Sequence, residues 1–147
     1  MRVLNRLPNL FVIFIVLLSC ENDDNNVDCT TALPAPDWFE IGFFNSQGDP
    51  LIGTVYQQAD FRLFNSETEI FISPMLFGDS DRLLVPYREI ESNKEYYIEL
   101  TPSDMDTLNF NFESTQGPCF LNFDLQEVIY NGDTIQVLNT NRVDFIK

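Results

Sequence analysis

Histidine is absent from this sequence of 147 residues. Histidine is the general base of the Ser-His-Asp and Cys-His nucleophile systems, and it is the commonest nitrogen ligand of zinc. The sequence also lacks the GxSxG, P-loop and GxGxxG motifs. Its 23 acidic residues make some pairing of carboxylates inevitable, so such pairs do not by themselves predict a glycosidase. We therefore expect that the chain is not an enzyme.

Basic residues are also scarce, with 8 against 23 acidic ones. Two of the eight, Arg2 and Arg6, lie in the N-terminal leader described next, so the chain that follows it has six basic residues and a net charge of −17. Phosphates and anionic lipid headgroups repel such a chain. This balance predicts a well-solvated surface and no nucleic-acid partner.

No apolar run is long enough to cross a bilayer, because the longest, Leu10 to Leu18, has nine residues where about 20 are needed. Arg2 and Arg6 precede this run, which is the order of a signal peptide. The usual A-x-A cleavage pattern is missing, and the run ends in Leu17-Leu18-Ser19-Cys20. Residues 1–19 are therefore predicted to be a signal peptide.

The segment that ends at Cys20 resembles the lipobox of bacterial lipoproteins. In that family the cysteine carries a diacylglycerol and becomes the N-terminus, which implies lipidation of Cys20. The acidic, Asn-rich stretch Glu21–Asn26 resembles the export signal of surface lipoproteins of the Bacteroidota. The resemblance covers about two dozen residues and implies an outer-membrane anchor with the domain facing the cell exterior. A periplasm-facing domain, or an ordinary signal peptide with an incidental cysteine, is the alternative.

Two cysteines remain, Cys29 and Cys119, in a chain that is expected to be exported. Disulfides persist in export compartments, so we expect these two residues to be joined. A reactive thiol or a metal site is the alternative, although the sequence has neither a CxxC motif nor a histidine.

Apolar residues alternate with a period of two along most of the chain, and no amphipathic helix is evident. Phe39-Ile41-Phe43 and Leu108-Phe110-Phe112 are the clearest examples, and Asn131-Gly132 is typical of a type I′ hairpin turn. We expect a flexible tether at 20–33 and an all-β domain at 34–147. The predicted fold is an antiparallel β-sandwich, immunoglobulin- or transthyretin-like, with a small β-barrel as the alternative.

Candidate ligand-binding groups are few. Asp79 and Asp81, and Asp104 and Asp106, supply oxygen atoms that suit Ca²⁺, although aspartate also ends strands and caps turns without any metal. No other cofactor is expected. Trp38 and Tyr87 are the aromatic residues most suited to stacking on a sugar or anchoring a partner, and Tyr56, Tyr97 and Tyr130 are further candidates.

These observations favour a non-catalytic, lipid-anchored protein of the envelope that serves as a binding or accessory subunit of a larger complex. Its partner is expected to be an envelope protein or an extracellular glycan, bound by loops such as Phe77–Arg82 and Thr101–Thr107. A carbohydrate-binding module is the second hypothesis and a small hydrolase the third.

Overall fold

The computed structural model describes residues 28–74, 81–137 and 141–147. Cys20 and Asp79 lie outside these ranges. A compact unit runs from Ala32 to Lys147. The described part of the preceding unit, residues 28–31, is a short segment in which Asp28 accepts hydrogen bonds from Thr30.

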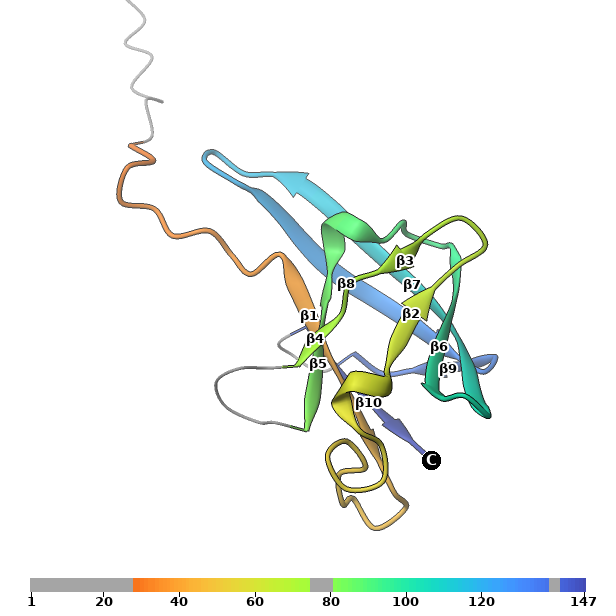
Figure 1. Ribbon diagram of the computed structural model, residues 1–147. Helices are drawn as coiled ribbons and strands as arrows, with labels where there is room; N and C mark the ends of the chain where they lie inside the picture. Colours follow the sequence, from red (N-terminus) through yellow and green to blue (C-terminus); the bar gives the residue numbers. More distant parts are fainter. Residues whose placement is uncertain (1–27, 75–80, 138–140) are drawn as a thin grey trace, which may run out of the picture. The chain divides into compact units, whose positions relative to one another are not determined.

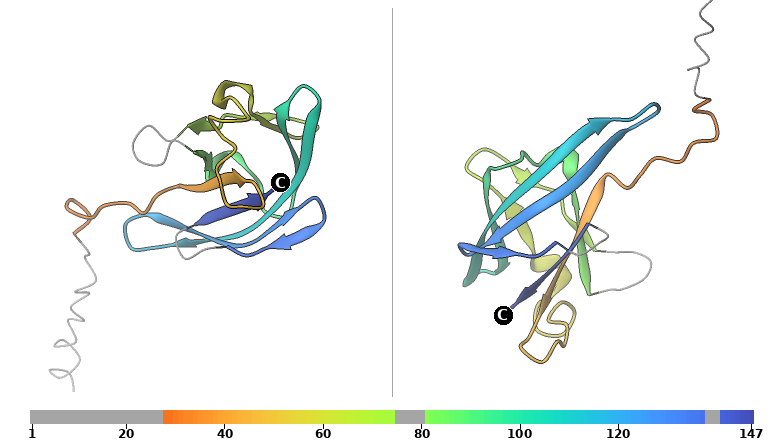
Figure 2. Two further views of the ribbon diagram at one scale, coloured as in Figure 1. Left: turned by 90° about the horizontal axis from the view of Figure 1, so that it is seen from below. Right: turned by 180° about the vertical axis from the view of Figure 1, so that it is seen from behind.

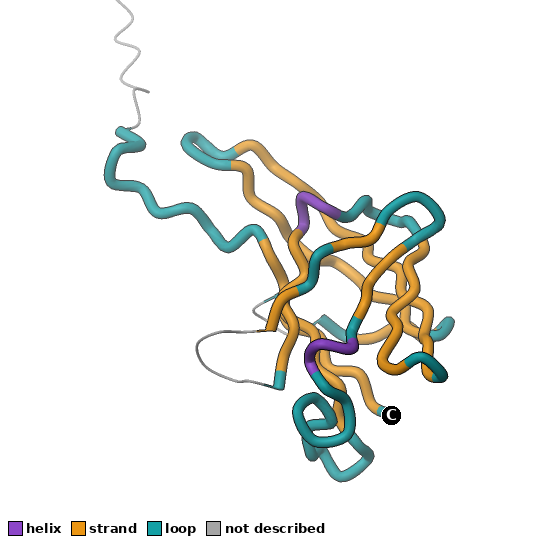
Figure 3. The backbone as a smooth tube through the Cα atoms, in the orientation of Figure 1, coloured by secondary structure: helices purple, strands orange, loops and turns teal. Residues whose placement is uncertain are grey.

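The described part of the domain consists of strands and two single-turn 3-10 helices (Figures 1 and 3), and none of its helices could span a bilayer. The elements are β1 (Trp38–Phe44), η1 (Gln58–Asp60), β2 (Arg62–Phe64), β3 (Glu69–Ile70), β4 (Ser73–Pro74), β5 (Arg82–Pro86), η2 (Tyr87–Glu89), β6 (Glu95–Thr101), β7 (Asp104–Gln116), β8 (Leu121–Tyr130), β9 (Asp133–Ile135) and β10 (Arg142–Ile146). They form a four-stranded sheet, ordered β10-β1-β5-β4, and a six-stranded sheet, ordered β3-β2-β6-β7-β8-β9.

The two sheets pack face to face through the apolar sides of their strands. Phe39 of β1 contacts Phe110 of β7 with ring centroids 5.1 Å apart, and Phe43 contacts Tyr130 at 6.3 Å. Burying one such side chain contributes roughly 2–3 kcal/mol. The sheets remain separate over the described residues, so the β-sandwich prediction is confirmed and the small-barrel alternative is not.

One pairing departs from the expected all-antiparallel arrangement. β1 and β10 run parallel, with Glu40 opposite Arg142 and Phe44 opposite Ile146. In β10, Val143 and Phe145 are buried, and this alternation is the same for either strand direction. The sequence therefore did not reveal that β10 runs parallel to β1.

The longest ladder joins β7 and β8, seen in Figure 2 as a hairpin that extends beyond the neighbouring strands. β6 ends at Thr101 and β7 begins at Asp104, so the loop expected at Thr101–Thr107 is reduced to a short turn. At the other end of β8, Asn131 and Gly132 have φ of 51° and 91°, which confirms the predicted type of turn.

Cys119, at the tip of the β7–β8 hairpin, forms the predicted disulfide with Cys29. Ninety residues separate the two cysteines along the chain. In the chain-entropy model a bridge acts mainly by restricting the unfolded chain, and it acts more strongly for longer loops.

Replacing both Cys29 and Cys119 with serine is expected to lower the free energy of unfolding by up to about 4–5 kcal/mol, the size of the lost loop constraint. Urea unfolding of Cys20→Ser protein, with and without the two further substitutions, measures this difference without interference from lipid. Equal midpoints, or two alkylatable thiols in the natively purified Cys20→Ser protein, would contradict the assignment.

Candidate functional site

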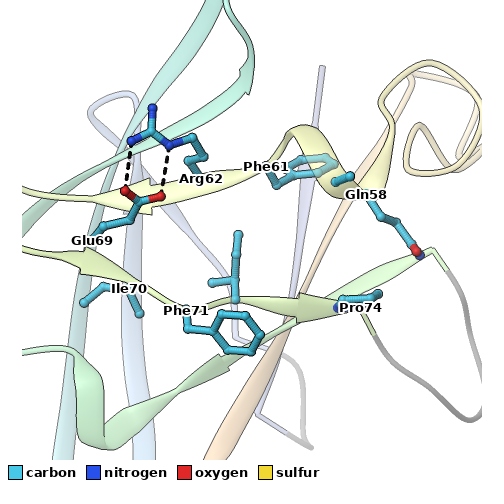
Figure 4. Close-up of a pocket in the computed structure, with 9 residues that line it drawn as sticks. Gln58, Phe61, Arg62, Glu69, Ile70, Phe71 and Pro74 are labelled. Atoms are coloured by element: carbon cyan, nitrogen blue, oxygen red, sulfur yellow. Dashed lines mark hydrogen bonds and ion pairs between the residues drawn. The ribbon is translucent and has the colours of Figure 1, made fainter.

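A cleft of about 550 Å³ opens at the side of the sandwich where the chain passes from one sheet to the other (Figure 4). After β3, at the edge of the six-stranded sheet, Phe71 and Ile72 lead directly into β4, at the edge of the four-stranded sheet. This crossing forms one wall, and η1 with the start of β2 forms the other. The lining residues are Gln58, Ala59, Phe61, Arg62, Glu69, Ile70, Phe71, Ile72 and Pro74.

The lining of the cleft is mainly apolar. Phe61 and Ile70 are buried, whereas the Phe71 side chain is 74% exposed. The backbone N–H of Phe71 donates to Glu89 Oε2 at 3.2 Å, which fixes the crossing segment. The volume falls within the 300–1,000 Å³ typical of ligand pockets, and an apolar lining with few polar groups is also typical of them.

Arg62 and Glu69 supply the charges of the cleft, and they form a bidentate pair (Figure 4). Arg62 donates through Nε and Nη2 to the two Glu69 oxygens, both at 2.9 Å, and through Nη1 to Glu99 at 3.3 Å. The hydrogen bonds from Arg62 lower the pKa of Glu69. Glu69 is therefore held as a paired carboxylate, an arrangement suited to orienting a bound group and poorly suited to accepting a proton as a general base.

The aromatic residues that were predicted to bind a ligand differ in their exposure to solvent. Trp38 is 40% exposed and borders two further hollows, of about 180 and 370 Å³. Tyr87 is only 1% exposed and stacks on Phe123 at 4.9 Å, so it has no face left for a ligand. Tyr56 and Tyr130 are also buried, and Tyr97 is partly buried. The sheet surface therefore presents one of these aromatic residues, Trp38, prominently to solvent.

The structure brings Asp104 and Asp106 together, and both bind a lysine. Lys147 Nζ lies 2.6 Å from Asp104 Oδ1 and 2.9 Å from Asp106 Oδ2. Tyr56 donates to Asp104 at 2.9 Å, and Tyr130 donates to Asp106 at 2.6 Å.

The oxygen atoms proposed for Ca²⁺ are thus engaged by an ammonium group and two hydroxyls. Asp81 lies elsewhere, just before β5. Within the described residues no three acidic, cysteine or histidine side chains gather into a group able to hold a metal ion.

Sequence reasoning missed an ion pair on the outer side of the four-stranded sheet, in which the arginine is buried. Arg82 is 1% exposed, its Nη1 lies 2.7 Å from Asp144 Oδ1, and its guanidinium stacks over Phe44 at 5.3 Å. A Cβ at Gly42 would lie 2.6 Å from the Phe44 ring, so the glycine makes room for this contact. The isolated glycine in the apolar β1 pattern was the available signal.

Asp104→Asn is expected to lower the free energy of unfolding by about 1–2 kcal/mol at neutral pH, because it weakens charge-assisted hydrogen bonds. The hydrogen bond from Lys147, with the smaller one from Tyr56, lowers the pKa of Asp104 below its ordinary 3.8. This stabilisation is therefore present above pH 3.8 and is lost as the pH falls through the lowered pKa.

Urea unfolding at several pH values tests this, with Asp133→Asn as the matched control because Asp133 is exposed and has no hydrogen bond from its side chain to another described residue. The difference between wild type and Asp104→Asn should shrink below about pH 4. A difference that stays constant with pH would show that charge is not its source.

No protein-family model matches the chain, and no match to it was found among curated proteins or among solved structures.

Proposed function

We propose that this chain is a lipid-anchored, non-catalytic binding subunit of an outer-membrane or cell-surface complex. In this proposal the cleft between β2 and the β3–β4 crossing receives an apolar segment of an envelope protein. The observation that carries it is the cleft lining, in which exposed Phe71 stands beside buried Phe61 and Ile70. Large apolar side chains around a hollow are typical of protein-binding sites.

The chemistry of the cleft supports binding over bond cleavage. Its carboxylate, Glu69, is paired with Arg62 through two hydrogen bonds, and no second carboxylate lines it among the residues that the structure describes. A glycosidase needs two carboxylates on opposite sides of the bond it cleaves. The hydrolase hypothesis therefore gains no support from this site.

The lipid anchor is proposed from the lipobox-like sequence before Cys20 and the acidic tether after it. The acidic stretch Glu21–Asn26 has no apolar residue to bury, so it provides reach. We propose that the domain faces the cell exterior, with a periplasm-facing domain as the alternative.

Protein extracted from membranes should have the intact mass of residues 20–147 plus acyl chains, and Cys20→Ser should remove both the acyl mass and membrane retention. Protease added to intact cells should digest the domain, and replacing Asp23 and Asp24 with alanine should protect it. A mature N-terminus other than residue 20 would refute the anchor. Digestion of the wild type only after lysis would favour the periplasmic face.

Ile72→Asp is expected to weaken partner capture at least roughly tenfold, because it places an unpaired charge in an apolar cleft. The measurement is affinity purification from detergent-solubilised membranes, followed by titration of the recovered partner. Met105→Asp is the matched control, since it adds the same charge at an exposed position outside the cleft.

Equal capture by both variants, with unchanged circular dichroism, would count against the cleft. Binding of a soluble glycan that is lost with Trp38→Ala and kept with Ile72→Asp would instead favour a carbohydrate-binding module.

A further inference from the structure

One end of the domain exposes apolar side chains around the tip of the β7–β8 hairpin. Leu33 is 91% exposed, and Trp38 follows it at the start of β1. The hollow of about 370 Å³ beside Trp38 is also lined by Phe120 and Leu121 from the hairpin. The start of β1 and the hairpin tip lie on the same side of the domain in Figures 1 and 2. We call this surface, formed by Leu33, Pro34, Trp38, Phe120 and Leu121, the Trp38 end.

The hollow of the Trp38 end has no net charge in its lining, although the chain is strongly acidic. The charged residues that line its hollow are Asp37 and Arg88, and Arg88 Nε donates to Asp37 Oδ2 at 3.1 Å. One positive and one negative charge cancel there, on a chain whose net charge is −17 without its leader. Lipid headgroups repel an apolar, locally uncharged surface less than they repel an acidic one.

Covalent connectivity keeps the hairpin tip close to the expected lipid. Cys29 follows Cys20 by nine residues, and its disulfide partner Cys119 lies at the tip. Nine residues span at most about 32 Å when extended, and about 15–18 Å on average as a flexible coil. The disulfide therefore limits how far the hairpin tip moves from the lipidated residue.

The opposite end of the ladder is acidic and distant. β7 has 13 residues, so Asp104 at its start lies about 40 Å from the hairpin tip, at ~3.3 Å per residue. When the tip faces the bilayer, the carboxylates of Asp104 and Asp106 are directed away from the headgroups.

We propose that the Trp38 end rests on the membrane that carries the lipid, with Leu33, Trp38 and Phe120 in the headgroup region of a zwitterionic bilayer. This inference depends on the lipid anchor proposed above. Tryptophan is enriched at the membrane–water interface because its ring is amphipathic. A short tether to the lipid raises the local concentration of the Trp38 end at the bilayer to the millimolar range. A weak intrinsic affinity of this surface for the bilayer is therefore sufficient.

Trp38 is the single tryptophan of the chain, so its fluorescence reports on this surface directly. The test uses protein extracted with its lipid from membranes and reconstituted into phosphatidylcholine vesicles, with and without bromine on the acyl chains. We expect brominated lipid to remove most of the Trp38 emission. Substituting both Cys29 and Cys119 with serine should reduce this quenching while leaving the protein on the vesicles.

Two single variants distinguish membrane contact by the Trp38 end from membrane attachment through the lipid. Leu33→Ser should reduce quenching, whereas Met105→Ser, which removes an exposed apolar side chain far from the Trp38 end, should not. Both variants should float with the vesicles, because the lipid holds them there.

The outcomes distinguish this inference from the proposed function. Acylated protein that floats with the vesicles while its Trp38 emission is unquenched overturns the membrane contact alone. Protein without acyl mass that does not float overturns the anchor and this orientation together. Emission that is unquenched by lipid and shielded from acrylamide only when a co-purified protein is added would assign the Trp38 end to a protein partner, which also overturns the proposal.

Discussion

The pairing of β7 with β8 is the constraint on which most of the structure depends. Its first half belongs to the six-stranded sheet and contributes Phe110 and Val128 to the core. Its second half continues past the neighbouring strands, where Phe112 and Phe123 pack on Tyr87. The start of β7, before this pairing begins, carries the carboxylates that bind Lys147, and the hairpin tip carries the disulfide. One long local pairing thus sets the positions of both ends of the domain.

The features that could be predicted from the sequence are those that depend on neighbouring residues or on composition. Alternation in β1 placed Phe39, Ile41 and Phe43 in the core, because successive side chains of a strand point to opposite faces. Asn131-Gly132 specified its turn, because both residues accept positive φ. The disulfide followed from composition and the expected compartment. Each of these inferences needs only neighbouring residues or a count of cysteines.

The features that the sequence did not reveal depend on residues far apart in the chain. The contact between Lys147 and Asp104 joins positions 43 residues apart, and no periodicity indicates it. Tyr87 lies in η2, outside any strand, so alternation could not place its ring in the core. The cleft exists because the chain changes sheets at Phe71 and Ile72. Sheet assignment is set by the global packing, and the strand pattern is the same in either sheet.

The distribution of charge explains why apolar surfaces matter in so acidic a domain. All six basic side chains that follow the leader lie within 4.0 Å of a carboxylate oxygen: Arg62, Arg82, Arg88, Lys94, Arg142 and Lys147. The surplus acids keep the surface solvated and favour no anionic partner. The cleft and the Trp38 end each contain one Arg–carboxylate pair amid apolar side chains. Because all six of these basic side chains are already paired within the domain, we propose these two apolar surfaces as its contact sites, since an apolar lining costs little to desolvate.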